Sequence, residues 1–199
     1  MNKALRIFFM VFLLFVLSGC AGRDFVRPSS DAFILGKTTY SQIMQKMGEP
    51  RTVGDALRNG KNIKFVSYTY AEAGGEPLEE GVIPTRSMRF SFYNDILVSQ
   101  GFSSSFRSDN SNFDDTKISA IVKGKTSRSE VIQLLGKPTS SLIYPMAKGS
   151  SSEAIGYGYF AARRGAPFTG LKLFSKSLII SFDNKNIVSD INYELSGTK

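Results

Sequence analysis

Two stretches of the chain, residues 36–50 and 124–138, share one pattern of polar and apolar positions. They read Gly-Lys-Thr-Thr-Tyr-Ser-Gln-Ile-Met-Gln-Lys-Met-Gly-Glu-Pro and Gly-Lys-Thr-Ser-Arg-Ser-Glu-Val-Ile-Gln-Leu-Leu-Gly-Lys-Pro, with seven identities in fifteen positions. Within each stretch, apolar residues three and four positions apart predict a short helix with one buried face. The repetition at a fixed long spacing indicates a tandem duplication.

Both predicted helices carry signals for their ends. Thr39 with Gln42, and Ser127 with Glu130, have the spacing of a capping box, in which side chain and backbone bond reciprocally at the first turn. A glycine and then a proline follow each helix, at positions 48 and 50 and at positions 136 and 138, a pattern typical of termination. A second short helix is expected before each, over residues 31–35 and 116–123.

Alternating apolar positions downstream of each helix predict strands. Met88, Phe90 and Phe92 fall on one face of such a strand, and the second half repeats the alternation over residues 178–182. The expected strands cover residues 63–70, 87–93 and 97–102 in the first half and residues 155–160, 178–182 and 187–193 in the second.

The predicted fold class is α+β, with two tandem ααβββ modules, each a short helix pair packed on a three-stranded antiparallel sheet. Residues 103–115 are polar and rich in structure-breaking residues, so they are expected to link the modules, held in place by Phe106 and Phe113. The expected organisation is a signal peptide at 1–19, a tether at 20–30, a first module at 31–102, the linker at 103–115 and a second module at 116–199.

The N-terminus has the features of a secretory signal. Lys3 and Arg6 precede an apolar run over residues 7–17, which is too short to span a bilayer as a helix. The Leu-Ser-Gly-Cys that follows resembles the lipobox of bacterial lipoproteins, which implies cleavage before Cys20 and acyl chains on that residue. Ala21 in place of an aspartate implies transport to the outer membrane, with the chain on its periplasmic face. The alternative is an ordinary signal peptide that happens to end near a cysteine.

The amino-acid composition limits the kinds of catalytic and metal-binding site that the chain can form. Cys20 is the only cysteine and histidine is absent, so His-based triads and the commonest metal ligand are excluded. The formal net charge of +8 suits an anionic membrane surface but falls short of the dense basic patch of a nucleic-acid binder. Asp114 and Asp115 stand where a helix N-terminus needs a cap. We therefore expect no catalytic, cofactor or metal site, no nucleic acid and no small-molecule substrate.

Charge distinguishes two equivalent connections between predicted strands. In the first half the connection carries four glutamates and one arginine, whereas in the second half it is basic. Candidate contacts with anionic headgroups or an acidic partner are Arg163, Arg164, Lys172 and Lys176. The alternative is that both connections are solvated loops.

Four tyrosines at matching places in the two halves are candidate aromatic anchors for a partner. They are Tyr68, Tyr70, Tyr157 and Tyr159. The alternative places their rings in the core with the hydroxyls at its edge. Uncovered sheet faces lying side by side would form a concave surface.

Both halves follow Gly-Lys-Thr-x-x-x-Glu/Gln-Val/Ile-x-x-x-x-Gly-x-Pro and later Phe-x-Asn-x-x-Leu/Ile-Val. This pattern resembles the SmpA/OmlA (BamE-like) domain, the fold of the small lipoprotein of the outer-membrane β-barrel assembly machinery. It is also similar to the paired modules of β-lactamase inhibitor protein. The resemblance covers about residues 31–102 and 116–195.

The resemblance implies a non-enzymatic envelope lipoprotein. We expect a binding or scaffold protein, anchored in the membrane through acylated Cys20, that serves outer-membrane protein assembly or envelope integrity through an envelope protein partner. The alternative is a proteinaceous inhibitor of a periplasmic or extracellular hydrolase.

Overall fold

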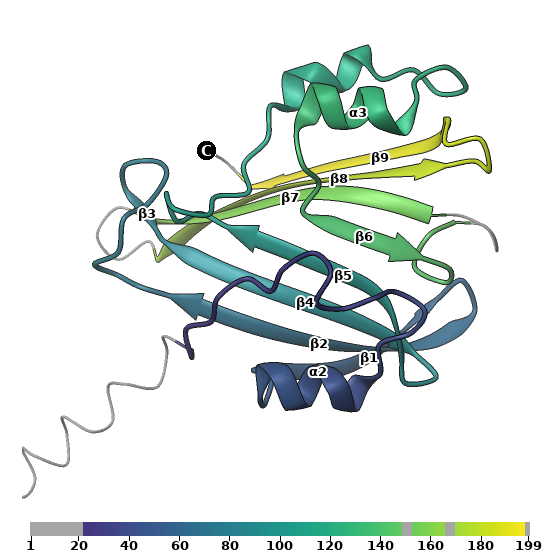
Figure 1. Cartoon of the computed structure of the whole chain (residues 1–199). Helices are drawn as coiled ribbons and strands as arrows, with labels where there is room; N and C mark the ends of the chain where they lie inside the picture. Colours follow the sequence, from purple (N-terminus) through teal and green to yellow (C-terminus); the bar gives the residue numbers. More distant parts are fainter. Residues whose placement is uncertain (1–21, 149–152, 166–169, 198–199) are drawn as a thin grey trace, which may run out of the picture.

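One antiparallel sheet runs through the described part of the chain, which in this computed structural model comprises residues 22–148, 153–165 and 170–197 (Figure 1). The strands are β1 (Thr52–Arg58), β2 (Lys61–Ala71), β3 (Val82–Ile83), β4 (Thr85–Tyr93), β5 (Ile96–Ser104), β6 (Ser140–Ile143), β7 (Glu153–Arg164), β8 (Leu171–Phe182) and β9 (Val188–Gly197). Their order in the sheet is β1-β2-β4-β5-β6-β7-β8-β9, and β3 pairs with β7.

The predicted fold class, two ααβββ modules that each carry a separate three-stranded sheet, is wrong. Each half contributes four strands to the path, and β5 pairs with β6, so that both halves share one sheet. The sequence predicts β2, β4, β5, β7, β8 and β9 but not β1, β3 or β6. The β1 sequence, Thr-Val-Gly-Asp-Ala-Leu-Arg, mixes strand-forming with strand-breaking residues, and β6 has only four residues.

The two capped helices are confirmed as α2 (Tyr40–Met47) and α3 (Arg128–Leu135). At the start of α3, Ser127 Oγ accepts a hydrogen bond from the Glu130 amide at 3.3 Å, and the Glu130 carboxylate accepts one from the Ser127 amide at 2.7 Å. The same capping box begins α2. The glycines that end α2 and α3 have φ of 77° and 81° with ψ of −166° and −168°, a region that essentially only glycine occupies. The repeated sequence thus adopts one local conformation twice.

The helices predicted before α2 and α3 are not α-helices. Residues 31–35 form turns, with the Ala32 amide bonded to the Ser29 carbonyl at 3.0 Å. The equivalent segment of the second half is the 3₁₀ helix η1 (Asp115–Ala120), capped by the Asp114 carboxylate, which accepts from the Thr116 amide. The five residues at positions 31–35 gain too few hydrogen bonds to offset helix nucleation.

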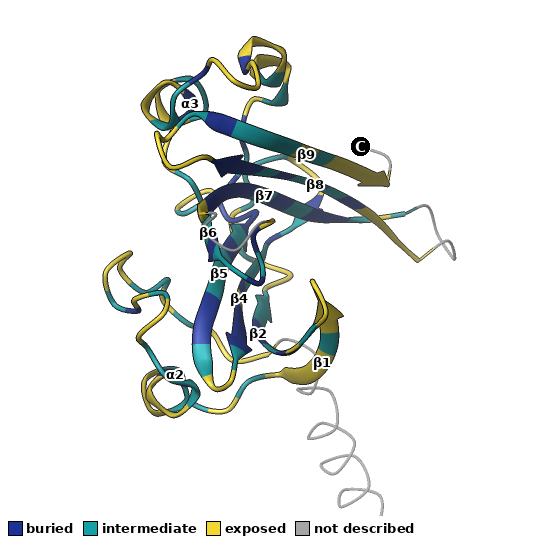
Figure 2. Ribbon diagram, turned by 90° about the vertical axis from the view of Figure 1, so that its right-hand side faces the viewer, coloured by how far each residue is buried: buried dark blue, intermediate teal, exposed yellow. Residues whose placement is uncertain are grey.

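α2 and α3 cover the same face of the sheet (Figure 2). Ile43 of α2 belongs to one buried cluster with Phe90, and Val131 of α3 belongs to another with Ile180. The strand register places Phe90 and Ile180 on one face, because directly paired residues of antiparallel strands share a face. All four side chains are 0% exposed, so each half has a core beneath its own helix.

The opposite face, here called the helix-free face, is the inner side of a curl. Asn59, in the turn between β1 and β2, donates hydrogen bonds to the carbonyls of Pro145 at 3.0 Å and Ala147 at 3.3 Å. These two segments meet although β4 and β5 lie between β2 and β6. Ala147 also packs against Leu142 and Ala154 of the helix-free face. The sheet therefore curls toward this face into a half-barrel, and residues 144–148, which follow β6, cover one end of it.

The segment between the halves is packed against the sheet. Ser111 Oγ accepts from the Ser104 amide at 2.9 Å and donates to the Gly158 carbonyl of β7 at 2.6 Å. Phe106 and Phe113 are each 7% exposed, which agrees with their predicted anchoring role.

An ion pair between a buried lysine and a partly exposed aspartate fixes η1 to the sheet. The Lys176 ammonium of β8 is 3% exposed and donates to the Asp115 carboxylate at 2.8 Å and to the Phe113 carbonyl. The Tyr193 hydroxyl donates to the other Asp115 oxygen at 2.6 Å. The Lys176 hydrogen bond, followed by that from Tyr193, lowers the pKa of Asp115 to about 2.

We expect Asp115→Asn to lower the free energy of unfolding at neutral pH by on the order of 2 kcal/mol, because Lys176 loses its counter-charge. The pKa of Asp115 is about 2 in the folded protein, against an ordinary value of 3.8. Its contribution to stability is therefore present above about pH 4 and is lost as the pH falls toward 2. Denaturant titrations from neutral to acidic pH should show a steeper loss of unfolding free energy with falling pH in wild type than in the variant.

Asp95→Asn is the matched control, because the Asp95 side chain forms only an exposed ion pair with Lys64 at 3.5 Å. Identical acid profiles for wild type and Asp115→Asn would contradict this role.

A second prediction concerns two glycines on one face of β7. A Cβ at Gly156 would lie 3.1 Å from Ser140 Cβ and 3.3 Å from the Leu178 carbonyl oxygen, whereas a Cβ at Gly158 would meet nothing within 4 Å. We expect Gly156→Ala to cost about 1 kcal/mol of unfolding free energy through overpacking. Gly158→Ala should be neutral or stabilising by about 0.5 kcal/mol. Thermal unfolding measures both, and equal effects would show that the repeat junction is not tightly packed.

Candidate functional site

None of the described helices lies on the helix-free face (Figure 2), and the strand register places residues of both repeats on it. One row of directly paired residues crosses it from β2 to β9: Ser67, Arg89, Gly101, Ser140, Gly156, Ile179 and Asn192. Arg89 and Asn192 are exposed, and the residues in the middle of the row are small. The centre of the face is therefore hollowed, with longer side chains toward both sides.

Apolar side chains continue this face along β7 and β8. Phe160 and Ile179 are half-buried, while Leu173 is 52% and Leu171 is 57% exposed. The register places all four on the helix-free face, and serines at positions 87, 103, 175 and 177 lie on the same face. Exposed apolar side chains gathered on one face are typical of surfaces that bind proteins.

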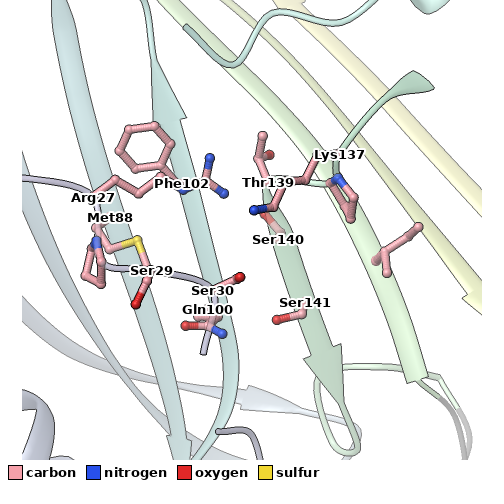
Figure 3. A pocket seen from close by; sticks show the side chains of 13 residues that line it. Arg27, Ser29, Ser30, Met88, Gln100, Phe102, Lys137, Thr139, Ser140 and Ser141 are labelled. Atoms are coloured by element: carbon pink, nitrogen blue, oxygen red, sulfur yellow. The ribbon is translucent and has the colours of Figure 1, made fainter. Parts of the chain in front are cut away.

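A pocket of about 280 Å³ lies on the other side of the sheet, where the two repeats meet (Figure 3). One wall is the N-terminal segment, including Arg27, and the opposite wall is the segment after α3, including Lys137. Phe102 of β5 and Ile155 of β7 contribute apolar surface. The pocket depends on both repeats, because its walls come from each of them.

The lining of this pocket is basic and rich in hydroxyls. Arg27 and Lys137 are its charged residues, and no carboxylate lines it. The Arg27 guanidinium lies 4.6 Å from the centre of the Phe102 ring. Burial lowers the pKa of Arg27, and the charge of Asp109 partly opposes that change.

Two of the predicted tyrosine anchors fix the helices instead. The Tyr68 hydroxyl donates to the carbonyl of Gly48 at the end of α2 at 2.8 Å, and Tyr157 donates to the carbonyl of Gly136 at the end of α3 at 2.9 Å. Tyr68 is 6% and Tyr157 is 2% exposed, and burial raises the pKa of each to about 12. The same bond holds the helix end in both repeats, so these rings occupy the core.

The other two tyrosines also contact residues of this chain. Tyr159 is buried beside Phe174, and its pKa is raised to about 12, first by burial and then by the charge of Glu79. Tyr70 is half-buried and stacks on Phe106, with ring centres 5.9 Å apart. Tyr159 therefore has its ring in the core, as the alternative prediction for these tyrosines stated. Tyr70 is only half-buried, but its ring packs against another residue of the same chain.

Charges of opposite sign on the equivalent connections pair with each other. Arg163 forms an ion pair with Glu79 and donates to the Glu80 carbonyl at 2.7 Å. Its backbone pairs with Val82 of β3. Arg163 thus joins the acidic connection of the first half to the second half. Lys176 is buried with Asp115, as described above, so neither cation points freely toward a membrane or a partner.

Arg164 and Lys172 are exposed and form no ion pair within the described residues. They remain candidate contacts. Cys20, the predicted lipid attachment site, lies outside the described residues.

Several residues of these surfaces were not predicted. Arg89 and Phe160 look unremarkable in the sequence because their exposure depends on the curl of the sheet. Lys137 stands at the repeat position that Glu49 occupies in the first half, and this charge difference is the signal that would have drawn attention to the pocket.

Within the described ranges, no helix has the length and apolar character needed to cross a bilayer. The same part of the chain holds no group of three or more Asp, Glu, His or Cys residues placed to bind a metal ion.

Comparisons with known proteins give one distant structural similarity. No protein-family model and no curated protein matches the chain. A crystal structure of a candidate β-lactamase inhibitor protein from Streptococcus mutans is similar, with a TM-score of 0.39 and 15% sequence identity. The similarity covers 79% of this chain and 82% of that one.

Proposed function

We propose that this chain is a non-enzymatic binding protein of the cell envelope, and that its helix-free face receives a folded partner protein. Acyl chains on Cys20 hold it at the periplasmic face of the outer membrane. The observation that carries the proposal is a single concave surface built by both repeats. A curved sheet offers many side chains to one convex partner at the same time, which is how protein interfaces reach a sufficient buried area.

The side chains on this face support the proposal. Binding energy at interfaces is concentrated in a few side chains, and aromatic residues and arginine are enriched there. Phe160 and Arg89 are of these types, and Ile179 adds apolar surface to the same face. Arg89 forms no ion pair within the described residues, so its charge is available to an acidic partner.

The proposal has two forms, which differ in the partner. In the first, the partner is a component of outer-membrane protein assembly and the chain is an accessory scaffold. In the second, the partner is a periplasmic or extracellular hydrolase that the chain inhibits. Because both repeats share one sheet, such an inhibitor has no two separate modules between which to hold its target. Its single concave face would cover the active site of the hydrolase.

Site-specific photo-crosslinking separates the two forms. A photoreactive phenylalanine analogue replaces Phe160 on the helix-free face, and a matched protein carries it at Ile132, which is 38% exposed on α3. An integral β-barrel or a subunit of its assembly complex, captured from position 160, supports the scaffold. A stoichiometric hydrolase supports the inhibitor. Equal capture from both positions, or none from position 160, would contradict the proposed surface.

We expect the double variant Arg89→Glu, Phe160→Ala to reduce the amount of co-purified partner at least tenfold, because it removes two anchors of the same face. Ile132→Ser, on the helix side, should leave the partner yield unchanged. Quantitative mass spectrometry of the purified membrane complex measures the yield, and thermal unfolding checks that both variants are folded.

A further inference from the structure

The pocket between the repeats brings two cations together. Figure 3 shows the side chains of Arg27 and Lys137 reaching toward each other from opposite walls. Arg27 comes from the N-terminal segment and Lys137 from the segment that follows α3. Two like charges that converge on one cavity repel each other. An anion placed between them would attract both and so offset this repulsion.

Arg27 is held in place without a counter-ion. Its guanidinium is half-buried against the Phe102 ring, and no carboxylate of the described residues lies within ion-pair distance of it. Burial lowers the pKa of Arg27, with the more distant Asp109 opposing. A partly desolvated charge without a partner is unfavourable, so the site is poised for a ligand of negative charge.

The remaining polar groups are suited to an oxyanion. Residues of the lining that can offer hydroxyls are Ser29, Ser30, Thr139 and Ser141, whereas the Ser140 side chain lies on the helix-free face. Hydroxyl and guanidinium donors are the groups that bind phosphate oxygens in proteins. The volume of about 280 Å³ accommodates a phosphate group with a short organic substituent.

A comparison of the two repeats points to the same residue. Position 137 in the second repeat corresponds to position 49 in the first, where the chain has glutamate. Both residues follow the glycine that ends a helix of identical local conformation. The backbone at this position therefore accepts either charge, and lysine occupies it in the repeat whose helix end faces the pocket.

We propose that this pocket binds a small oxyanion of the phosphate class, either free or as the headgroup of a phospholipid. The inference does not depend on the protein-binding function proposed above. It makes the N-terminal segment that leads from the membrane anchor one wall of a ligand site.

Isothermal titration calorimetry of the purified full-length protein in neutral detergent micelles tests the proposal. One arm titrates inorganic phosphate and glycerol 3-phosphate at constant ionic strength set with sodium chloride. The other compares micelles doped with phosphatidylglycerol against micelles doped with phosphatidylcholine. Saturable binding of the soluble phosphates identifies a free ligand, and binding confined to phosphatidylglycerol identifies a headgroup.

Lys137→Glu should weaken binding about tenfold or more, because a charged hydrogen bond is replaced by repulsion. The first repeat carries glutamate at this position, so the variant is expected to fold, and thermal unfolding checks this. Arg27→Gln should weaken binding to a similar extent. Lys125→Glu is the control, since it makes the same charge change at an exposed position outside the pocket. Absence of saturable binding in every arm, or an equal loss in Lys125→Glu, would overturn the proposal.

Discussion

The antiparallel pairing of β5 with β6 is the constraint on which the rest of the structure depends. Only three residue pairs, Ser99 with Leu142, Gln100 with Ser141 and Gly101 with Ser140, join the repeats in this register. That pairing turns two four-stranded units into one sheet with a common helix side and a common inner side. Both candidate surfaces exist because of it, since the concave face spans the junction and the pocket lies on its other side.

The local features of the fold could be predicted from the sequence because they depend on neighbouring residues. The capping boxes at Thr39 and Ser127 and the alternating strands follow from interactions within a few positions of the chain. The sequence does not predict β1, because its residues mix strand-forming and strand-breaking types although its partner β2 follows directly in the chain. It does not predict β6, because that strand has only four residues and pairs with β5, which lies far earlier in the chain. The ααβββ prediction fails for the same reason, since a strand of four residues decides whether the halves are separate or fused.

The candidate contacts illustrate a similar limit. Arg163 and Lys176 appear in the sequence as excess positive charge, but their partners Glu79 and Asp115 lie more than sixty residues away. A charge count along the chain cannot reveal such pairs. The tyrosines could be assigned to matching places but not to a role, because the hydroxyls of Tyr68 and Tyr157 find their acceptors at the ends of the helices.

The N-terminal segment has a further consequence. Asp24 pairs with Arg86 at 2.7 Å, and Phe25 packs edge-on against Tyr68, with ring centres 6.3 Å apart. The first firmly held residue is thus only four positions after Cys20, a reach of about 14 Å in extended chain. If Cys20 carries acyl chains, the linker to the membrane is short and the domain stays within a thin layer beside the bilayer. It would then meet only partners that are embedded in the membrane or that diffuse to it.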